Sequence, residues 1–290
     1  MMPVGCRPAG SASDKLYDRM LTLLSPTFAA KSIWRHRNLV AAMVRRDILG
    51  RYNGSVLGLL WSFIIPLLML TVYTFVFGVV FQARWDVGIG SQTEFAVVLF
   101  LGLIIYNLLA EVLNRSPSLI LGNVNFVKKV VFPLEILPVI TLLSTLFHMA
   151  ISFVVWLLAY LVFFGIPPLT AFLFPLMLFP LILFALGFSW FLASLGVYLR
   201  DTSQFIGVLT TVLLFLSPIF YPISILPPGF QTALHLNPLT FIIEQSRGIL
   251  MWGQMPHWGT LAFVTGVAMV VASLGFAWFQ KTRGGFADVI

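Results

Sequence analysis

The sequence predicts an all-α integral membrane protein with six transmembrane helices. Three observations support this fold class: an apolar composition, long segments without charged residues, and an uneven distribution of Lys and Arg between the segments that join them. Of the 290 residues, 59% are hydrophobic and 9% are charged, whereas a soluble domain carries about 25% charged residues. So few charges cannot cover a water-exposed surface, and we therefore expect lipid to surround most of the chain.

The charge-free segments locate the spans. A spanning helix needs about 20 mainly apolar residues. The longest charge-free segment, 136–199, is too long for one helix, and Gly165, Pro167 and Pro168 divide it because Pro cannot continue a helix and Gly favours a turn. The predicted spans are residues 57–82, 95–113, 138–164, 170–199, 205–223 and 260–280.

The distribution of Lys and Arg predicts the orientation. An even number of spans places both termini on the same side of the membrane. With the termini in the cytoplasm, fifteen of the 17 Lys and Arg residues lie in cytoplasmic segments, and only Arg84 and Arg247 lie outside. Lys and Arg are retained on the cytoplasmic side, so this asymmetry predicts cytoplasmic N- and C-termini. It also accounts for the net charge of +7, and we expect no nucleic-acid partner.

Three regions flank or interrupt the permease domain, which we place at 54–290. Residues 1–30 are expected to form an N-terminal extension, for which disorder is one interpretation, and contain no signal-peptide core. Residues 31–53 are basic and predict one amphipathic helix on the cytosolic membrane face, although Asp47 falls near its apolar stripe. That stripe consists of Leu39, Val40, Met43, Val44 and Ile48. Residues 224–259, on the outside, are expected to form short helices that dip towards the membrane.

Several kinds of chemistry have no counterpart in the sequence. There is no G-x-x-x-x-G-K-[ST] phosphate loop, so any ATP that the protein uses must be bound by another chain. Because it has one Cys and four scattered His residues, the sequence predicts neither a disulfide nor a metal site. No pair of acidic residues lies within a span, which disfavours an ion-coupled carrier. We therefore predict no catalytic residue and no cofactor in this chain.

Two patterns within the spans each have two interpretations. Five polar residues of the third span share one helical face, and they either line a transport pathway or form hydrogen bonds between helices. They are Thr141, Ser144, Thr145, His148 and Ser152. Aromatic residues gather in the first and fifth spans, where they either anchor the helices at the membrane interface or provide a surface on which sugar rings pack.

Several residue strings, in order from about residue 39 to the C-terminus, carry a family resemblance. The first group is Arg46-Asp47, Arg51-Tyr52, Leu57-Gly58, Trp61 and Pro66. The second is Asn125, Val127-Lys128-Lys129, Phe132-Pro133 and Ile136-Leu137-Pro138. The third is Tyr198 with Arg200-Asp201, then Ser217-Pro218-Ile219, Tyr221-Pro222, Leu226-Pro227, Asn237-Pro238-Leu239 and Arg247. Together these strings resemble the polysaccharide ABC exporter permeases of the O-antigen type.

The resemblance implies a transporter subunit of the bacterial inner membrane. Such a permease works as a homodimer with two copies of a phosphate-loop ATPase subunit, which binds ATP and Mg. The substrate that the resemblance implies is a polysaccharide attached to an undecaprenyl-diphosphate carrier lipid. The family's channel is lined by the first and fifth spans, so the candidate channel-lining residues are Trp61, Tyr73, Phe77, Phe81, Phe215, Phe220 and Tyr221.

The resemblance also implies three further groups of site residues. Contacts with the ATPase are expected from a short helix within 116–132 and from the loop after the fourth span, where Arg200 and Asp201 are expected to pair. The candidates are Asn125, Lys128, Lys129, Arg200 and Asp201. Candidates for binding the lipid diphosphate are Arg46 and Arg51. Candidates for an extracellular gate are Asn237, Glu244 and Arg247, and the last two, three residues apart, are expected to pair on one helical face.

Other function classes remain open at this point. An exporter of the same fold for teichoic acid, capsule or a small hydrophobic drug fits the charge-poor spans equally well. A membrane enzyme that acts on lipid-linked sugars is a second alternative, although the sequence places no cluster of acidic residues or His at one membrane face. The order of the motifs favours the glycan exporter.

Overall fold

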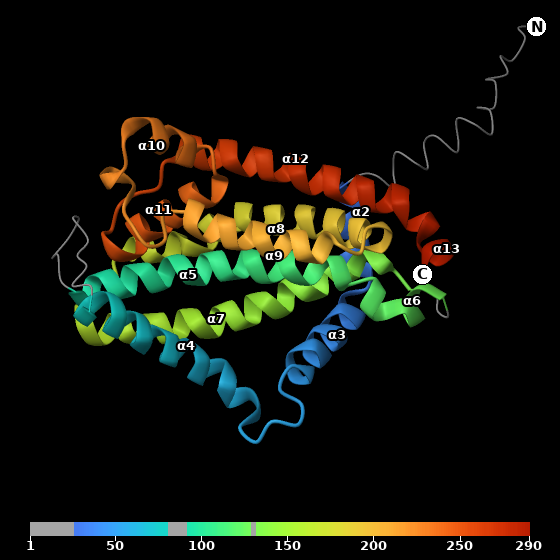
Figure 1. Cartoon of the computed structure of the whole chain (residues 1–290), viewed down its shortest axis with the longest axis horizontal. Helices are drawn as coiled ribbons and strands as arrows, with labels where there is room; N and C mark the ends of the chain where they lie inside the picture. The colour runs from blue at the N-terminus through green and yellow to red at the C-terminus, as the bar shows by residue number, and fades with distance from the viewer. Residues whose placement is uncertain (1–25, 81–91, 129–131) are drawn as a thin grey trace, which may run out of the picture.

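The computed structural model describes residues 26–80, 92–128 and 132–290, and every regular element among them is a helix (Figure 1). The helices that correspond to the predicted spans are α4 (Trp61–Tyr73), α5 (Gln92–Arg115), α7 (Leu137–Phe164), α8 (Phe174–Tyr198), α9 (Thr202–Leu216) and α12 (Trp258–Thr282). The other α-helices are α2 (Pro26–Arg35), α3 (Arg37–Gly50), α6 (Val124–Lys128), α10 (Pro228–His235), α11 (Pro238–Met251) and α13 (Phe286–Val289). The all-α prediction is confirmed for this part of the chain.

Five helical segments of the described residues are long and apolar enough to cross a membrane: Gly58–Phe77, Thr93–Ser118, Leu134–Phe164, Leu169–Tyr198 and Trp258–Val289. They match five of the six predicted spans. The predicted span 205–223 is wrong at its C-terminal end, because α9 has 15 residues and ends at Leu216. Ser217 is extended, with ψ at 146°, and it precedes Pro218, which disfavours helical geometry in the residue before it. The six-span count therefore stays a prediction.

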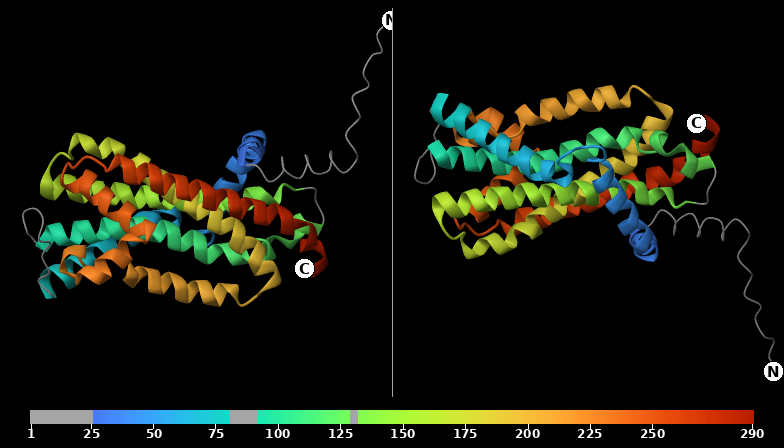
Figure 2. Two further views of the ribbon diagram at one scale, coloured as in Figure 1. Left: turned by 90° about the horizontal axis from the view of Figure 1, so that it is seen from above. Right: turned by 90° about the horizontal axis from the view of Figure 1, so that it is seen from below.

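Helix α5 lies at the centre of the bundle, between α4, α7, α8, α9 and α11 (Figure 1). In its most apolar stretch 83% of the residues are buried, whereas the corresponding figure for the segment that contains α4 is 11%. Helix α4 lies at one side of the bundle, and both views of Figure 2 show the golden α9 at the periphery. The described part of the chain therefore has a buried central helix, and α4 and α9 are among the helices exposed around it.

The two ends of the bundle differ in charge. At one end, which we call the basic end, lie α6, α13 and the C-terminus, and at the other end lie α10 and α11 (Figure 1). Apart from Arg247, the described Lys and Arg residues fall into two groups. One group belongs to α2, α3 and the turn after α3, and the other belongs to the connections and helix ends at the basic end. This distribution agrees with the asymmetry of the predicted segments, and the direction in which the bundle crosses the membrane stays a prediction.

The amphipathic segment forms two helices rather than the single helix predicted for 31–53. Helix α2 begins at Pro26, before the predicted boundary, and helix α3 ends at Gly50. The two meet at His36, which departs from helical geometry at φ −102° and ψ 18°. The His36 ring donates a hydrogen bond from Nδ1 to the Ser32 carbonyl at 2.9 Å, and that carbonyl also accepts the His36 backbone N–H. Val40 and Met43 bury the apolar face of α3 against the start of α7.

Helices α8 and α12 pack closely because glycines face each other. A Cβ atom on Gly275 would lie 2.0 Å from the carbonyl oxygen of Gly187, and one on Gly187 would lie 2.7 Å from the carbonyl oxygen of Val271. Small residues let helix backbones approach in this way in membrane proteins, where van der Waals packing drives association. A hydrogen bond of 2.6 Å between the hydroxyls of Ser194 and Thr282 joins the same two helices near the basic end.

We expect Gly275→Ala to destabilise the protein, because the added Cβ forces α8 and α12 apart. Overpacking of this kind costs about 1–3 kcal/mol, and the thermal unfolding temperature of the purified protein in detergent should fall. Gly266→Ala on the same helix is the matched control, since its Cβ would meet nothing within 4 Å and Ala favours a helix over Gly. Equal unfolding temperatures for the two variants would show that the glycine contact is unimportant.

Candidate functional site

An ion pair at the basic end joins three helices. Arg115, the last residue of α5, donates two hydrogen bonds to the carboxylate of Asp47 on α3, at 2.7 and 2.8 Å. The hydroxyl of Ser144 on α7 donates to the same carboxylate. Asp47, which interrupts the apolar stripe of the predicted amphipathic helix, therefore points into the bundle.

The environment of Asp47 keeps it ionised. Burial raises the pKa of this carboxyl, but the hydrogen bonds from Arg115 and Ser144 and the nearby guanidinium groups outweigh burial and hold the pKa below its ordinary value of 3.8. The stabilising effect of a carboxylate with a lowered pKa is present above its ordinary pKa and is lost as the pH falls through the lowered value. The link between α3 and the bundle is therefore intact at neutral pH.

A second set of contacts extends this network towards the middle of the bundle. Arg51 lies 2.9 Å from Oε1 of Glu111 on α5, and Arg115 lies 3.6 Å from the same oxygen. Both contacts have the distance of an ion pair without the alignment of a hydrogen bond. The hydroxyl of Tyr52 lies 3.4 Å from Nδ1 of His148 on α7. Charged and polar groups thus continue from the turn after α3 to the interior faces of α5 and α7.

The predicted lipid-diphosphate residues lie in one basic pocket. Its volume is about 480 Å³, and it is lined by Arg46, Asp47, Gly50, Arg51 and Arg115. Arg51 and Arg115 are paired with carboxylates, whereas Arg46 has no carboxylate partner among the described residues. Its guanidinium lies 5.9 Å from the centre of the Phe126 ring of α6. The pocket therefore carries more positive than negative charge and is suited to an anion.

A polar cavity of about 520 Å³ lies between α5, α7 and α9. Its polar lining residues are Asn107, Glu111, Asn114, Thr145, His148, Ser152, Thr210 and Thr211. The predicted polar face of α7 divides between two roles: Ser144 bonds to Asp47 on another helix, whereas Thr145, His148 and Ser152 line the cavity. Hydrogen bonding between helices is confirmed for Ser144, and a transport pathway along this face stays a prediction.

Sequence reasoning missed the contributions of α5 and α9 to this cavity. Asn107 and Asn114 are isolated polar residues in an apolar helix, and their spacing of seven residues, two helical turns, is the only signal that they share a face. Thr210 is buried, and its backbone carbonyl accepts a hydrogen bond of 2.7 Å from the hydroxyl of Tyr106 on α5. Its own hydroxyl lies 3.2 Å from Nδ2 of Asn114. These bonds attach α9 to α5.

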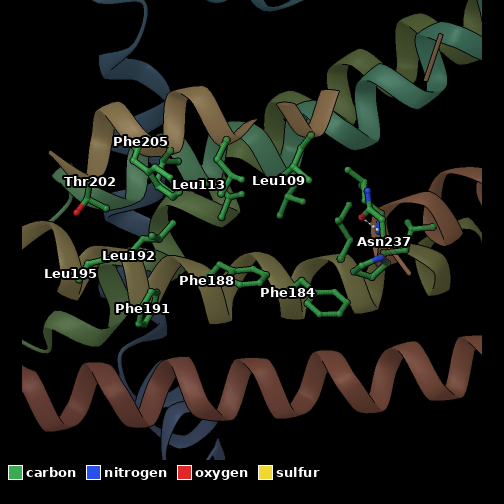
Figure 3. Close-up of a pocket in the computed structure, with 17 residues that line it drawn as sticks. Leu109, Leu113, Phe184, Phe188, Phe191, Leu192, Leu195, Thr202, Phe205 and Asn237 are labelled. Atoms are coloured by element: carbon green, nitrogen blue, oxygen red, sulfur yellow. Dashed lines mark hydrogen bonds between the residues drawn. The ribbon is translucent and has the colours of Figure 1, made fainter. Parts of the chain in front are cut away.

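The opposite face of α9 borders a second cavity, which is apolar (Figure 3). Its volume is about 370 Å³. Figure 3 shows Phe184, Phe188 and Phe191 of α8 on one side and Leu109 and Leu113 of α5 on the other. Helix α9 therefore separates an apolar cavity from a polar one.

Most of the predicted channel-lining residues form one aromatic cluster. The ring of Phe77 stacks with that of Phe220 at 5.9 Å, Phe220 stacks with Phe215 at 5.9 Å, and Tyr73 lies 6.5 Å from Phe77. The hydroxyl of Tyr221 donates to the Phe215 carbonyl at 2.9 Å. The structure thus brings aromatic residues of the predicted first and fifth spans together. Trp61, at the other end of α4, is not part of the cluster, and Phe81 lies outside the described residues.

The predicted gate residues anchor the end of the bundle that carries α10 and α11. The expected pair of Glu244 and Arg247 is confirmed, at 2.9 Å. Arg247 is fully buried, and it also donates to the carbonyls of Val98, Pro218 and Ile219. Asn237 accepts a hydrogen bond of 3.0 Å from the Leu239 N–H and so caps α11; its side chain also donates to Ser217 at 3.2 Å. These residues hold α11 against α5 and against the turn after α9.

Gly102 makes room for the Arg247 side chain. A Cβ atom on Gly102 of α5 would lie 2.7 Å from Nη2 of Arg247. The buried guanidinium is thus accommodated by a residue without a side chain on the neighbouring helix. A buried cation is retained in a membrane protein when its donors are satisfied in this way.

The candidates for contact with the ATPase lie at the basic end. Asn125 and Lys128 belong to α6, which confirms the short helix expected within 116–132. Lys129 lies outside the described residues. The expected pairing of Arg200 with Asp201 is wrong, because the structure has no ion pair between them. Asp201 instead occupies the N-cap position of α9, where its carbonyl accepts the backbone N–H groups of Gln204 and Phe205.

We expect Arg247→Met to lower the thermal unfolding temperature strongly, because it leaves Glu244 and the Pro218 and Ile219 carbonyls without their shared donor. Removing one member of a buried pair costs about 3–5 kcal/mol. Arg45→Met is the matched control, since Arg45 is exposed on α3. Arg247→Lys should fall between the two, because an ammonium keeps the charge without the planar fork of donors. Arg247→Met as stable as Arg45→Met would contradict the anchoring role.

The fold and these sites together define a class, a helical membrane protein with several apolar spans, a polar cavity between three of its helices and a basic end. Within this class, residues 38–251 match the model of the ABC-2 type transporter family. The chain belongs to this family.

Curated relatives align over nearly their whole length. The chain is 26% identical over 262 residues to the O-antigen export system permease protein RfbA of Myxococcus xanthus, which covers 90% of this chain and 98% of that protein. It is 27% identical over 256 residues to the protein of the same name from Klebsiella pneumoniae, which covers 87% and 95%. It is 26% identical over 246 residues to the polysialic acid transport protein KpsM of Escherichia coli, which covers 83% and 92%.

Proposed function

We propose that this chain is the permease subunit of an ATP-driven exporter that moves a lipid-linked polysaccharide of the O-antigen type across the bacterial inner membrane. The observation that carries the proposal is the alignment with O-antigen export permeases over 98% of the length of one of them. The basic pocket beside the polar cavity supports it, because a lipid-linked glycan combines a diphosphate with a hydroxyl-rich chain.

ATP and Mg, in this proposal, are bound by a separate ATPase at the basic end. The sequence has no phosphate loop of its own. The basic end offers the short helix α6 and the turn between α8 and α9, where Arg200 and Asp201 are exposed. These elements are the surfaces through which ATPase closure would reach the bundle. In this proposal the basic end and both termini lie inside the cell, which the retention of basic residues on the cytoplasmic side supports.

The proposed assembly is a homodimer with two ATPase subunits, and the glycan passes between the two permease chains. Helices α4 and α9 are suited to this interface because both are exposed and together they carry the aromatic cluster's neighbouring segments. Large apolar side chains face outwards along this side of the bundle, among them Phe63 and Leu67 of α4 and Phe75 of the π-helical segment Thr74–Val80 that follows it. The same three residues line an open apolar groove of about 680 Å³ between α4 and α7. The aromatic cluster of Phe77 and Phe220 then offers ring faces to passing sugars.

A capsular polysaccharide exporter is the second candidate. The alignment with a polysialic acid transport protein over 92% of that protein favours it. The two candidates share the permease role and differ in the glycan.

Deletion of the gene in its native host tests the proposal. Surface polysaccharide should disappear while lipid-linked polymer accumulates in the cell, as measured on gels of surface and cell fractions. A plasmid copy of the gene should restore the surface polymer. Unchanged surface polysaccharide would contradict glycan export, and loss of the surface polymer without accumulation inside would favour the alternative of a membrane enzyme.

Arg46→Ala should lower polysaccharide export about tenfold, because a charge-assisted contact with the lipid diphosphate contributes about 1.5–3 kcal/mol. The matched control is Arg45→Ala, which removes the same charge from the neighbouring position, outside the basic pocket. Arg46→Lys should retain part of the activity. Export is measured as surface polysaccharide per amount of permease in the membrane, and equal export by the two Ala variants would exclude a specific role for Arg46.

A further inference from the structure

The polar cavity between α5, α7 and α9 lies about midway along the bundle and opens at its surface, where Asn107 and Thr211 are exposed. Thr145, His148 and Ser152 follow Leu137, the first residue of α7, by 8, 11 and 15 positions. At a rise of about 1.5 Å per residue, they lie about 12 to 22 Å along a helix that crosses a hydrocarbon layer about 30 Å thick. A polar cavity at this depth is costly, and polar groups within spans mark substrate pathways.

The chemistry of the cavity wall selects the kind of ligand. Asn107 and Asn114 offer amide donors and acceptors, Ser152 and Thr211 offer hydroxyls, and His148 offers an imidazole. The one carboxylate in the wall, that of Glu111, is paired with Arg51 and Arg115. The wall thus combines donors and acceptors with its one acidic charge compensated. A neutral, hydroxyl-rich group fits such a wall better than a phosphate or a hydrophobic drug.

Hydrogen-bonding capacity remains in the wall. The hydroxyl oxygen of Thr145 is buried and has no hydrogen-bond partner among the described residues. The side chain of Asn107 is exposed. The hydroxyl of Ser152 donates only within its own helix, to the His148 carbonyl at 3.1 Å, and can still accept a bond from a ligand.

The cavity adjoins the basic pocket, because residues of the two walls contact each other. Arg51 lines the basic pocket, and its partner Glu111 lines the polar cavity. Tyr52, the next residue, reaches His148 in the cavity wall. A diphosphate in the basic pocket therefore places the sugars attached to it beside the polar cavity.

We propose that the polar cavity is a glycan-binding site that holds a neutral sugar unit of the transported chain by hydrogen bonds from α5, α7 and α9. The inference rests on the proposed export of a lipid-linked polysaccharide. It adds a sugar-binding site whose lining residues all belong to one protomer. The site favours sugars that present hydroxyl or amide groups. Its weak, exchangeable hydrogen bonds suit a polymer that must move on.

Ser152→Leu tests the site by filling the cavity and removing a hydroxyl. Ser273→Leu on α12 is the matched control: Ser273 is also half-buried and donates to the carbonyl four residues before it, at 2.7 Å, but does not line the cavity. In the deletion strain, full-length Ser152→Leu should lower surface polysaccharide about tenfold, at equal permease level in the membrane, with polymer accumulating inside. Ser273→Leu and Ser152→Thr should restore normal export.

Further results distinguish loss of the sugar site from misfolding of the variant and from failure of the proposed export function. If Ser152→Leu fails to reach the membrane, Asn107→Leu serves as the second variant, and normal export by it overturns the site. If gene deletion abolishes export and both cavity variants restore it fully, only this inference fails. If deletion leaves surface polysaccharide unchanged, the proposed function and the inference fail together.

A direct contact is measured by photo-cross-linking in living cells. Asn107→p-benzoyl-phenylalanine should yield, after irradiation, a permease band that reacts with antibody against the host's surface polysaccharide. Ser273→p-benzoyl-phenylalanine should yield none. Absence of the band at position 107, or equal labelling at both positions, would overturn the proposal.

Discussion

The position of Arg115 at the end of the buried helix α5 determines much of what surrounds it. Its guanidinium binds Asp47 and lies within 3.6 Å of Glu111, so α3 is held to the bundle by a pair that is only partly exposed. Without it, the half-buried Asp47 would lose the cation that offsets the cost of its partial desolvation. Because α3 is fixed there, the residues after it, Arg51 and Tyr52, reach Glu111 and His148. The basic pocket and its link to the polar cavity follow from this one anchor.

Helix α9 gives the bundle its second distinctive feature. It is too short to match the other spans, and its faces differ in chemistry: Phe205, Ile206 and Leu209 border the apolar cavity, whereas Thr210 and Thr211 border the polar one. Its attachment to α5 through Thr210 explains how a peripheral helix keeps a polar face towards the interior. The same arrangement places hydroxyls on the cavity wall, whereas a helix with only apolar side chains on this face would offer the cavity no hydrogen bonds.

The sequence predicted the long spans well and the ends of α9 and α3 less well. Five spans were recovered because each is a run of about 20 apolar residues, a local property. Among the spans, only the C-terminal end of 205–223 was wrong, because the non-helical residues after Leu216 are as apolar as those of a helix. The pair of Glu244 and Arg247 was predictable from its spacing on one helix. The complete burial of that arginine was not, because it depends on Gly102 of α5 and on the Pro218 and Ile219 carbonyls.

By itself, the sequence determined that lipid is the solvent of this protein, where five of its spans lie and which end of the bundle is basic. Each of these properties depends on the types of residue along continuous stretches of the chain, so it can be predicted without knowing how the helices pack. Only the tertiary structure decided that Asp47 pairs with Arg115, 68 residues away, and that Asn114 meets Thr210, 96 residues away. Isolated polar residues in apolar helices look alike in a sequence, and it is the packing of one helix against another that decides which of them form a site.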